Sequence, residues 1–248
     1  MNQDLQKSLF NRTELLLGAD TLRRIGEQRV ILFGVGGVGG WCAEALVRSG
    51  LRHLTIVDAD RVSATNVNRQ RVATVRTIGQ VKVDALREML LEINPEADIH
   101  AVQAVYHDDT AEGFHLAEYD YVIDAIDSLK DKASLLLRAS ETPAKVFSSM
   151  GAALKLDPTG IRVAEFWEVR GCPLGAALRK KMRREGKAPA QKILCVYDEE
   201  VLQNKGEETA LREDLAFNKV SHNGTLAHIT ALFGFTLAGL VIQDICRG

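Results

Sequence analysis

The 248-residue sequence lacks the cysteine pairs, the leader segment and the charge excess that characterise several common classes of protein. Its four cysteines stand far apart with no C-x-x-C pair, which excludes a zinc ribbon of that type and argues against a secreted disulfide framework. The first residues, M-N-Q-D-L-Q-K, contain no apolar core, so we expect no signal peptide and a reducing, cytoplasmic location. A formal net charge of −2 indicates no general affinity for nucleic acid and leaves only a local patch to supply one.

What is present fits a folded protein of ordinary composition. Hydrophobic residues make up 46% and charged residues 26%, and the length favours one large α/β unit or one such unit with an appendage. One stretch, residues 224–243, has no charged side chain and is long enough to cross a bilayer. Its threonines, histidine and glycines favour a helix buried in the core or at a subunit interface, and membrane association is the less favoured alternative.

Apolar runs and helical periodicity alternate through the first 150 residues. This alternation predicts an α/β fold, a Rossmann-like mostly parallel sheet with helices on both faces, which binds ligands at the carboxyl ends of its strands. The strands are expected at 29–34, 54–58, 99–105, 121–125 and 144–149, and the helices at 38–48, 80–93 and 129–140. We divide the chain into an N-terminal helical arm (1–28), a Rossmann-like nucleotide-binding core (29–150) and a C-terminal extension packed on the same domain (151–248). The extension is expected to hold an added strand at 160–167, a basic helix at 173–187, an irregular segment at 188–222 and the apolar helix.

A glycine-rich loop follows the first expected strand. Gly34, Gly36, Gly37 and Gly39 satisfy G-x-G-x-x-G and open a helix, where backbone N–H groups attract a phosphate. Asp58 ends the next strand, at the position from which a carboxylate can hold ribose hydroxyls. This loop alone does not separate NAD from ATP, and by itself it would favour an NAD dehydrogenase.

The residues that follow favour ATP. Asp58-Ala59-Asp60 leads into Asn66-Val67-Asn68-Arg69-Gln70 and then Gly79-Gln80-Val81-Lys82, a set that hydride transfer does not need. When a carboxylate attacks the α-phosphate of ATP, charge develops on the phosphoryl oxygens, and fixed Arg and Lys groups with Mg²⁺ stabilise it. Asp127 lies at the end of the fourth expected strand, where it could hold the magnesium ion or cap the following helix.

These motifs together resemble the ubiquitin-activating-type adenylating superfamily, whose shared set is G-x-G-G-x-G, D-x-D, N-x-x-R-Q, G-x-x-K and D-x-x-D. The resemblance implies that the four loop glycines hold the nucleotide and Asp58 the ribose. It implies that Asn66, Arg69 and Gln70 surround the phosphates, that Lys82 contacts them and that Asp127 coordinates magnesium. It also places Asp60, the second aspartate of the D-x-D motif, among the ATP-binding residues; a role confined to shaping the turn is the alternative. Asn11-Arg12 resembles the segment that brings an arginine onto the γ-phosphate of a partner subunit, which implies a homodimer; a solvent-exposed or intrachain Arg12 is the alternative.

The C-terminal half resembles the bacterial tRNA threonylcarbamoyladenosine dehydratases. The similar segments are 123–128, Leu156-Asp157-Pro158-Thr159, Cys172-Pro173-Leu174, 192–197 and 230–235, and the likeness covers nearly the whole chain. The resemblance implies ATP-dependent adenylation of a threonyl carboxylate in tRNA, followed by ring closure with loss of water. A cationic cluster could contact the tRNA or could be a solvated helix face, and its members are Arg179, Lys180, Lys181, Arg183, Arg184 and Lys187.

The sequence does not exclude several other functions. An activator of a small ubiquitin-like sulfur-carrier protein is the second hypothesis, and the missing C-x-x-C zinc pairs count against it. An NAD oxidoreductase and a non-catalytic nucleotide-binding scaffold are further alternatives. A sulfur-transfer partner protein is also open, although residues 219–224, before the last helix, contain no thiol. We expect Cys195 to be a buried thiol and Cys172 to be exposed.

Overall fold

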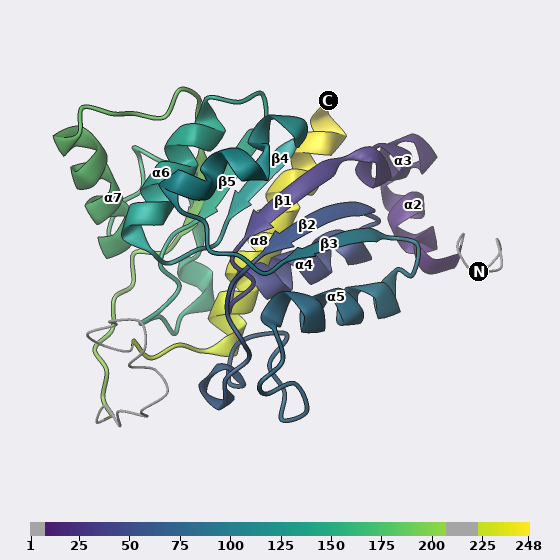
Figure 1. Ribbon diagram of the computed structural model, residues 1–248, viewed down its shortest axis with the longest axis horizontal. Helices are drawn as coiled ribbons and strands as arrows, with labels where there is room; N and C mark the ends of the chain where they lie inside the picture. Colours follow the sequence, from purple (N-terminus) through teal and green to yellow (C-terminus); the bar gives the residue numbers. More distant parts are fainter. Residues whose placement is uncertain (1–7, 207–222) are drawn as a thin grey trace.

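The computed structural model describes residues 8–206 and 223–248, which form a seven-stranded sheet with helices on both faces (Figure 1). The strands are β1 (Arg29–Phe33), β2 (His53–Val57), β3 (Asp98–Val102), β4 (Tyr121–Asp124), β5 (Lys145–Ser149), β6 (Arg162–Glu165) and β7 (Leu194–Tyr197). The helices are α2 (Asn11–Leu17), α3 (Ala19–Glu27), α4 (Gly39–Arg48), α5 (Lys82–Ile93), α6 (Leu129–Ser140), α7 (Pro173–Arg184) and α8 (Ala227–Arg247). Short 3-10 turns lie in the connections: η1 (Ala64–Asn66), η2 (Asp108–Phe114), η3 (Leu116–Glu118) and η4 (Pro158–Gly160).

The order of the strands creates one crevice at the carboxyl edge of the sheet. The order is β3-β2-β1-β4-β5-β7-β6, and every neighbouring pair is parallel except β6 and β7. The chain runs outward from β1 to β2 and β3 and then returns to β4 on the other side of β1. Ligands bind at such a reversal in open α/β sheets, so the predicted fold class is confirmed and the binding edge is placed between β1 and β4.

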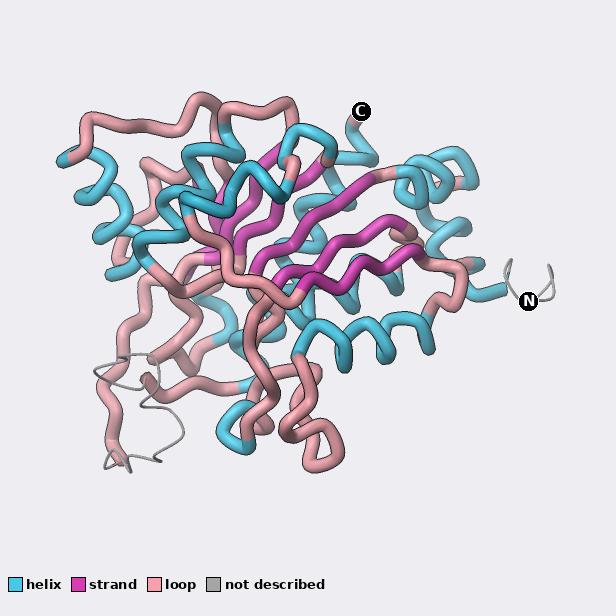
Figure 2. Tube along the Cα trace, in the orientation of Figure 1, coloured by secondary structure: helices cyan, strands magenta, loops and turns pink. Residues whose placement is uncertain are grey.

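Alternate side chains of β1 enter two separate cores. Val30 and Leu32 pack with α4, α5 and α8, whereas Ile31 and Phe33 pack with α6 and α7. Figure 2 shows the sheet lying between these two sets of helices. Burial on both faces is typical of a parallel sheet and explains the continuous apolar run of β1.

Helix α8 packs along α4, and the two helices make the largest helix–helix contact in the described part of the chain. The contact is close at Gly234, where a Cβ atom would lie 2.8 Å from the backbone nitrogen of Cys42 and 2.9 Å from the Cβ of Trp41. By length and composition α8 could cross a membrane, and it is the one helix of residues 8–206 and 223–248 that could do so. In this structure its stripe of Phe233, Leu237 and Val241 is buried in the core, as expected for an apolar core helix.

The prediction of an irregular segment over residues 188–222 is wrong in one part, because that segment contains a strand. Residues 194–197 form β7, which inserts between β5 and β6 in the sheet. The apolar run from Ile193 to Tyr197 was the available signal, but the surrounding polar residues hid it. The basic helix ends at Arg184 and not at residue 187, because the chain turns at Gly186 with a φ of +64°. Residues 207–222 of the segment lie outside the described residues.

Candidate functional site

The glycine loop joins β1 to α4 and faces the carboxyl edge of the sheet. Gly34 has a φ of +86°, and a Cβ atom there would lie 2.8 Å from the carbonyl oxygen of Ala125. Glycine is required at such a close approach in the left-handed region. A Cβ on Gly39 would overlap the carbonyl oxygen of Gly34, so the loop also closes tightly where α4 begins. The N-terminus of α4 therefore lies beside the loop at the crevice, an arrangement that suits a phosphate.

Two distant segments support the middle of this loop. A Cβ atom on Gly36 would lie 3.7 Å from Nε2 of Gln70, and one on Gly37 would lie 3.2 Å from Cγ2 of Thr230 in α8. Gln70 is buried, and its Oε1 has no hydrogen-bond partner among the described residues. Buried polar atoms are normally satisfied, so this oxygen beside the glycine loop fits a site completed by a bound nucleotide or by water. Thr230 opens the segment 230–235 that resembles the dehydratases, but nothing in the sequence indicated its contact with the loop.

Asp58, Asp60 and Lys82 form one connected group beside the loop. Asp58 accepts a hydrogen bond of 2.8 Å from the amide of Val35 and one of 2.9 Å from the amide of Asp60. Asp60 in turn accepts a 2.7 Å bond from Nζ of Lys82, whose side chain starts at the first residue of α5. Lys82 is only 5% exposed, which confines its ammonium group to this crevice. The structure thus brings together three residues that the sequence assigned to the nucleotide site.

Asn66 and Arg69 lie in the connection between β2 and α5. The side-chain oxygen of Asn66 accepts a 3.1 Å bond from the amide of Ser63, so it stabilises the turn η1. Nη1 of Arg69 donates to the carbonyl of Thr65 at 2.9 Å, while the Arg69 carbonyl accepts a 3.2 Å bond from the indole of Trp41. The last contact fixes this connection to α4, next to the glycine loop. Asn66 therefore has a local structural role in addition to any contact with phosphate.

Asp127 lies in the connection from β4 to α6, at the edge of the crevice. Its side chain is exposed, and Ser128 is the N-cap residue of α6, accepting from the amide of Asp131 at 3.4 Å. The N-cap position of α6 is therefore Ser128 and not Asp127. One carboxylate together with phosphates and water is a common way to bind Mg²⁺, so Asp127 fits a nucleotide-bound ion. In the described part of the chain, no group of three or more His, Cys, Asp or Glu side chains could form a metal cage by itself.

Arg12 lies far from the glycine loop of its own chain. It is exposed on α2, and the neighbouring Phe10 packs near Gly50, just beyond the last turn of α4. The glycine loop stands at the opposite end of α4, which is about 15 Å long at 1.5 Å per residue. Figure 1 shows α2 at the right, next to α3, and the connection between β2 and α5 at the bottom of the view. An intrachain role at the phosphates is thus excluded by position.

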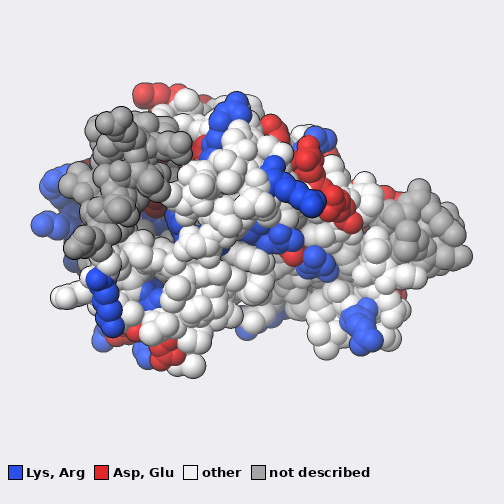
Figure 3. Space-filling view, turned by 90° about the horizontal axis from the view of Figure 1, so that it is seen from below, with Lys and Arg blue, Asp and Glu red and all other residues white. Residues whose placement is uncertain are grey.

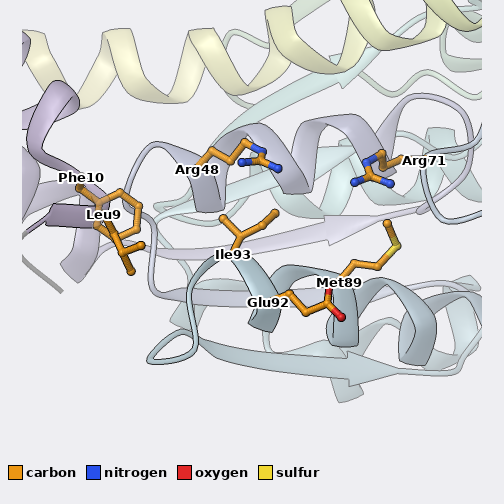
Figure 4. Close-up of a pocket in the computed structure, with 7 residues that line it drawn as sticks. All are labelled: Leu9, Phe10, Arg48, Arg71, Met89, Glu92 and Ile93. Carbon is orange, nitrogen blue, oxygen red and sulfur yellow. The ribbon is translucent and has the colours of Figure 1, made fainter. Parts of the chain in front are cut away.

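A groove runs along α4 between these two ends. It has a cavity of about 440 Å³, and Figure 4 shows Leu9 and Phe10 at one end and Arg71 at the other. Arg71 and Arg48 both bond to the buried carboxylate of Glu44. The groove connects the N-terminal arm with the segment that follows Gln70, and it lies outside the nucleotide crevice.

The members of the cationic cluster at α7 differ in exposure and in their contacts. Nη1 of Arg179 donates to the Phe166 carbonyl at 3.2 Å, and Lys181 pairs with Glu185 at 2.5 Å. Arg183 lies 5.3 Å from the centre of the Trp167 ring. The three remaining members are exposed, namely Lys180, Arg184 and Lys187. Figure 3 shows Lys and Arg side chains at the left margin, the side on which Figure 1 places α7.

The structure confirms the expected burial of Cys195 and contradicts the expected exposure of Cys172. Cys195 is buried, as expected, and burial raises the pKa of its thiol. Cys172 is also buried, so the expectation that it is exposed is wrong. As the N-cap residue of α7, its Sγ accepts from the amide of Gly175 at 3.5 Å. Buried thiols of this kind are inert. Of the segment 219–224, residues 219–222 lie outside the described residues.

A buried ion pair near Asp127 is a feature that the sequence did not predict. Nζ of Lys132 lies 2.6 Å from Oδ2 of Asp124, and both side chains are completely buried. Asp124 belongs to the D-x-x-D motif without an assigned role, and one lysine among the several charged residues of α6 gives no signal of its partner.

Comparison with known proteins agrees with this geometry. The family model described as ThiF family matches residues 10–246. The chain belongs to the ThiF family. The tRNA threonylcarbamoyladenosine dehydratase of Bacillus subtilis is 34% identical to this ThiF-family chain and covers 96% of it and 94% of its own length. The Escherichia coli dehydratase is 32% identical, with 98% and 95% covered.

Solved structures extend the similarity to three dimensions. The E. coli tRNA N6-threonylcarbamoyladenosine dehydratase in complex with ATP matches with a TM-score of 0.87 and 30% identity, over 100% of this chain and 97% of that one. A molybdopterin-synthase adenylyltransferase of E. coli is 33% identical over only 62% of this chain. The expected superfamily and fold are confirmed, and the dehydratases match over a greater length than the adenylyltransferase does.

Proposed function

We propose that this ThiF-family chain adenylates the threonyl carboxylate of threonylcarbamoyladenosine in tRNA with ATP and cyclises it with loss of water. The observation that carries the proposal is the connected group at the crevice, in which Lys82, Asp60 and Asp58 brace a glycine loop at the switch point of the sheet. A dehydratase with ATP bound has the same fold over the whole chain.

The chemistry requires positioning and charge stabilisation more than a protein nucleophile. A carboxylate oxygen of the substrate attacks the α-phosphorus, and pyrophosphate leaves with the electrons of the broken P–O bond. An internal nucleophile of the modified nucleoside then attacks the activated carbonyl carbon, and AMP leaves with that oxygen. Lys82 and Arg69 stabilise the negative charge on the phosphoryl oxygens, and Asp58 orients the ribose. When bound at Asp127, Mg²⁺ neutralises charge on the phosphates.

A homodimer completes the site in this proposal. Arg12 cannot reach its own crevice, and α2 presents Leu15 and Leu16, which are 78% and 82% exposed. An exposed apolar pair next to an arginine suits docking on a second copy, where Arg12 would meet the γ-phosphate. The proposed tRNA contacts are the exposed cations Lys180 and Arg184 of α7, together with Lys187 just beyond its end.

The test is the product of ATP cleavage. The protein is incubated with ATP and Mg²⁺ together with tRNA that does or does not carry the threonylcarbamoyl group. We expect AMP and pyrophosphate only with the modified tRNA. AMP formation that requires a small carrier protein with a diglycine tail instead would refute the tRNA substrate and favour the second hypothesis. ADP as the product would refute adenylation.

The composite site has its own test. Lys82→Ala and Arg12→Ala proteins should each be inactive, while their mixture should recover about a quarter of full activity after subunit exchange. Random pairing makes half of the dimers mixed, and each mixed dimer of a two-fold assembly has one complete site of two. A mixture as inactive as its components would show that Arg12 does not act across subunits.

A further inference from the structure

The buried pair Asp124–Lys132 bonds to Ile126, the neighbour of Asp127, which we assign to the magnesium ion. Asp124 is the last residue of β4, and Lys132 lies in the first turns of α6. Oδ2 of Asp124 is 2.6 Å from Nζ of Lys132 and also accepts a 2.6 Å bond from the hydroxyl of Ser148 in β5. The pair therefore joins two strands and a helix at the carboxyl edge of the sheet.

The same pair holds both polar groups of Ile126, the residue before Asp127. The Ile126 amide donates to Oδ1 of Asp124 at 3.2 Å, and its carbonyl accepts a 3.0 Å bond from Nζ of Lys132. The residue before Ile126 is held as well, because the amide of Ala125 donates to the Phe33 carbonyl at 2.8 Å. Hydrogen bonds therefore fix the backbone of the two residues that precede Asp127.

Stability alone does not account for such a pair. Burying two charges carries a desolvation cost that their attraction often only balances, and apolar residues of similar volume commonly replace a buried pair without loss of stability. The contacts of Lys132 point to a different role, since its ammonium group bonds to the connection that bears Asp127. Groups that orient a metal ligand from behind typically change metal affinity or activity about 10- to 100-fold when they are removed.

We propose that Lys132 is a positioning residue, which fixes the Asp127 carboxylate for nucleotide-bound magnesium through the Ile126 carbonyl. This inference rests on the proposed function, because it takes Asp127 as the magnesium ligand. Lys132 itself is fully buried and bonds to the Ile126 carbonyl and to Asp124, so it acts through the backbone and not as a ligand.

The test compares ATP affinity with and without Mg²⁺, measured by calorimetry with the full-length protein. The main variant is Asp124→Asn with Lys132→Met, which removes both charges, keeps the volume and leaves an acceptor for the Ile126 amide. We expect this variant to bind metal-free ATP as wild type does and to lose about tenfold or more of the affinity gained from Mg²⁺. An unchanged gain in the folded double variant would overturn the inference.

A matched control is a lysine–aspartate pair at the opposite edge of the sheet, formed by Lys145 and Asp244. Nζ of Lys145 lies 2.6 Å from Oδ2 of Asp244, between the start of β5 and the end of α8. Asp244→Asn with Lys145→Met removes the same charges far from the crevice and should leave the magnesium gain intact. If the main variant does not fold, Lys132→Arg replaces it, since arginine keeps the charge but moves the donors. A reduced magnesium gain in that variant supports the positioning role, and a wild-type gain refutes it.

Asp127→Asn separates this inference from the proposed function. If the wild-type gain survives in Asp127→Asn, the metal assignment itself fails. If Asp127→Asn loses the gain while the Asp124/Lys132 variant keeps it, the metal assignment stands and the positioning role of Lys132 is wrong.

Discussion

The contact between α4 and α8 provides a quantitative test of the packing, because two glycines of α8 differ only in their surroundings. A methyl group at Gly234 would meet the backbone of α4, whereas no atom lies within 4 Å of a Cβ at Gly239. Alanine is about 1 kcal/mol more favourable than glycine inside a helix, so Gly239→Ala should stabilise the protein by up to that amount. Gly234→Ala has the same gain but forces α4 away, and overpacking costs about 1–3 kcal/mol.

The difference between the two variants isolates the packing contribution, since the helix propensity cancels. For a chain of this size, about 1 kcal/mol corresponds to roughly 2–4 °C in Tm, so Gly234→Ala should melt about 2–12 °C below Gly239→Ala. The assay is thermal unfolding followed by circular dichroism, with ATP affinity measured on the same samples. Because α4 starts at the glycine loop, Gly234→Ala should also bind ATP more weakly. Equal Tm values for the two variants would refute the close contact.

Three further predictions concern the surface and the thiols. Lys180→Glu with Arg184→Glu should weaken tRNA binding. The slope of the logarithm of the binding constant against the logarithm of the salt concentration should become shallower by about one to two. An unchanged slope would show that α7 does not contact the tRNA. A thiol reagent should modify Cys246, the exposed cysteine, rapidly in the folded protein and the three buried cysteines only after unfolding; a second fast thiol would contradict the described burial. The Arg138 guanidinium lowers the pKa of Asp108 to about 2. A lowered carboxyl pKa stabilises the fold above its unfolded value near 4, and this stabilisation is lost as the pH falls through 2. Arg138→Gln should therefore flatten the free energy of unfolding between about pH 4 and pH 2, and an unaltered acid limb in a denaturant titration would count against the pair.

Much of the candidate site could be predicted because its motifs are local. The tight loop at Gly34 and Gly39 depends on backbone angles and close approaches that only glycine allows, so it is visible in the letters themselves. The position of Asp58 follows from strand length, since a strand that starts near residue 53 must end at the crevice. The separate roles of Asp127 and Ser128 could not be predicted in this way, because either side chain can cap a helix, and the choice depends on where α6 starts.

The sequence by itself determined the alternation of strands and helices, the glycine loop and the chemistry of the nucleotide residues, because these depend on periodicity and on local backbone preferences. Only the tertiary structure decided which distant segments meet. It inserted β7 between β5 and β6, placed Arg12 at the far end of α4, brought Thr230 against the glycine loop and buried Lys132 on Asp124. Each of these outcomes depends on the free energy of contacts between residues far apart in the chain, and no spacing within one segment records that energy.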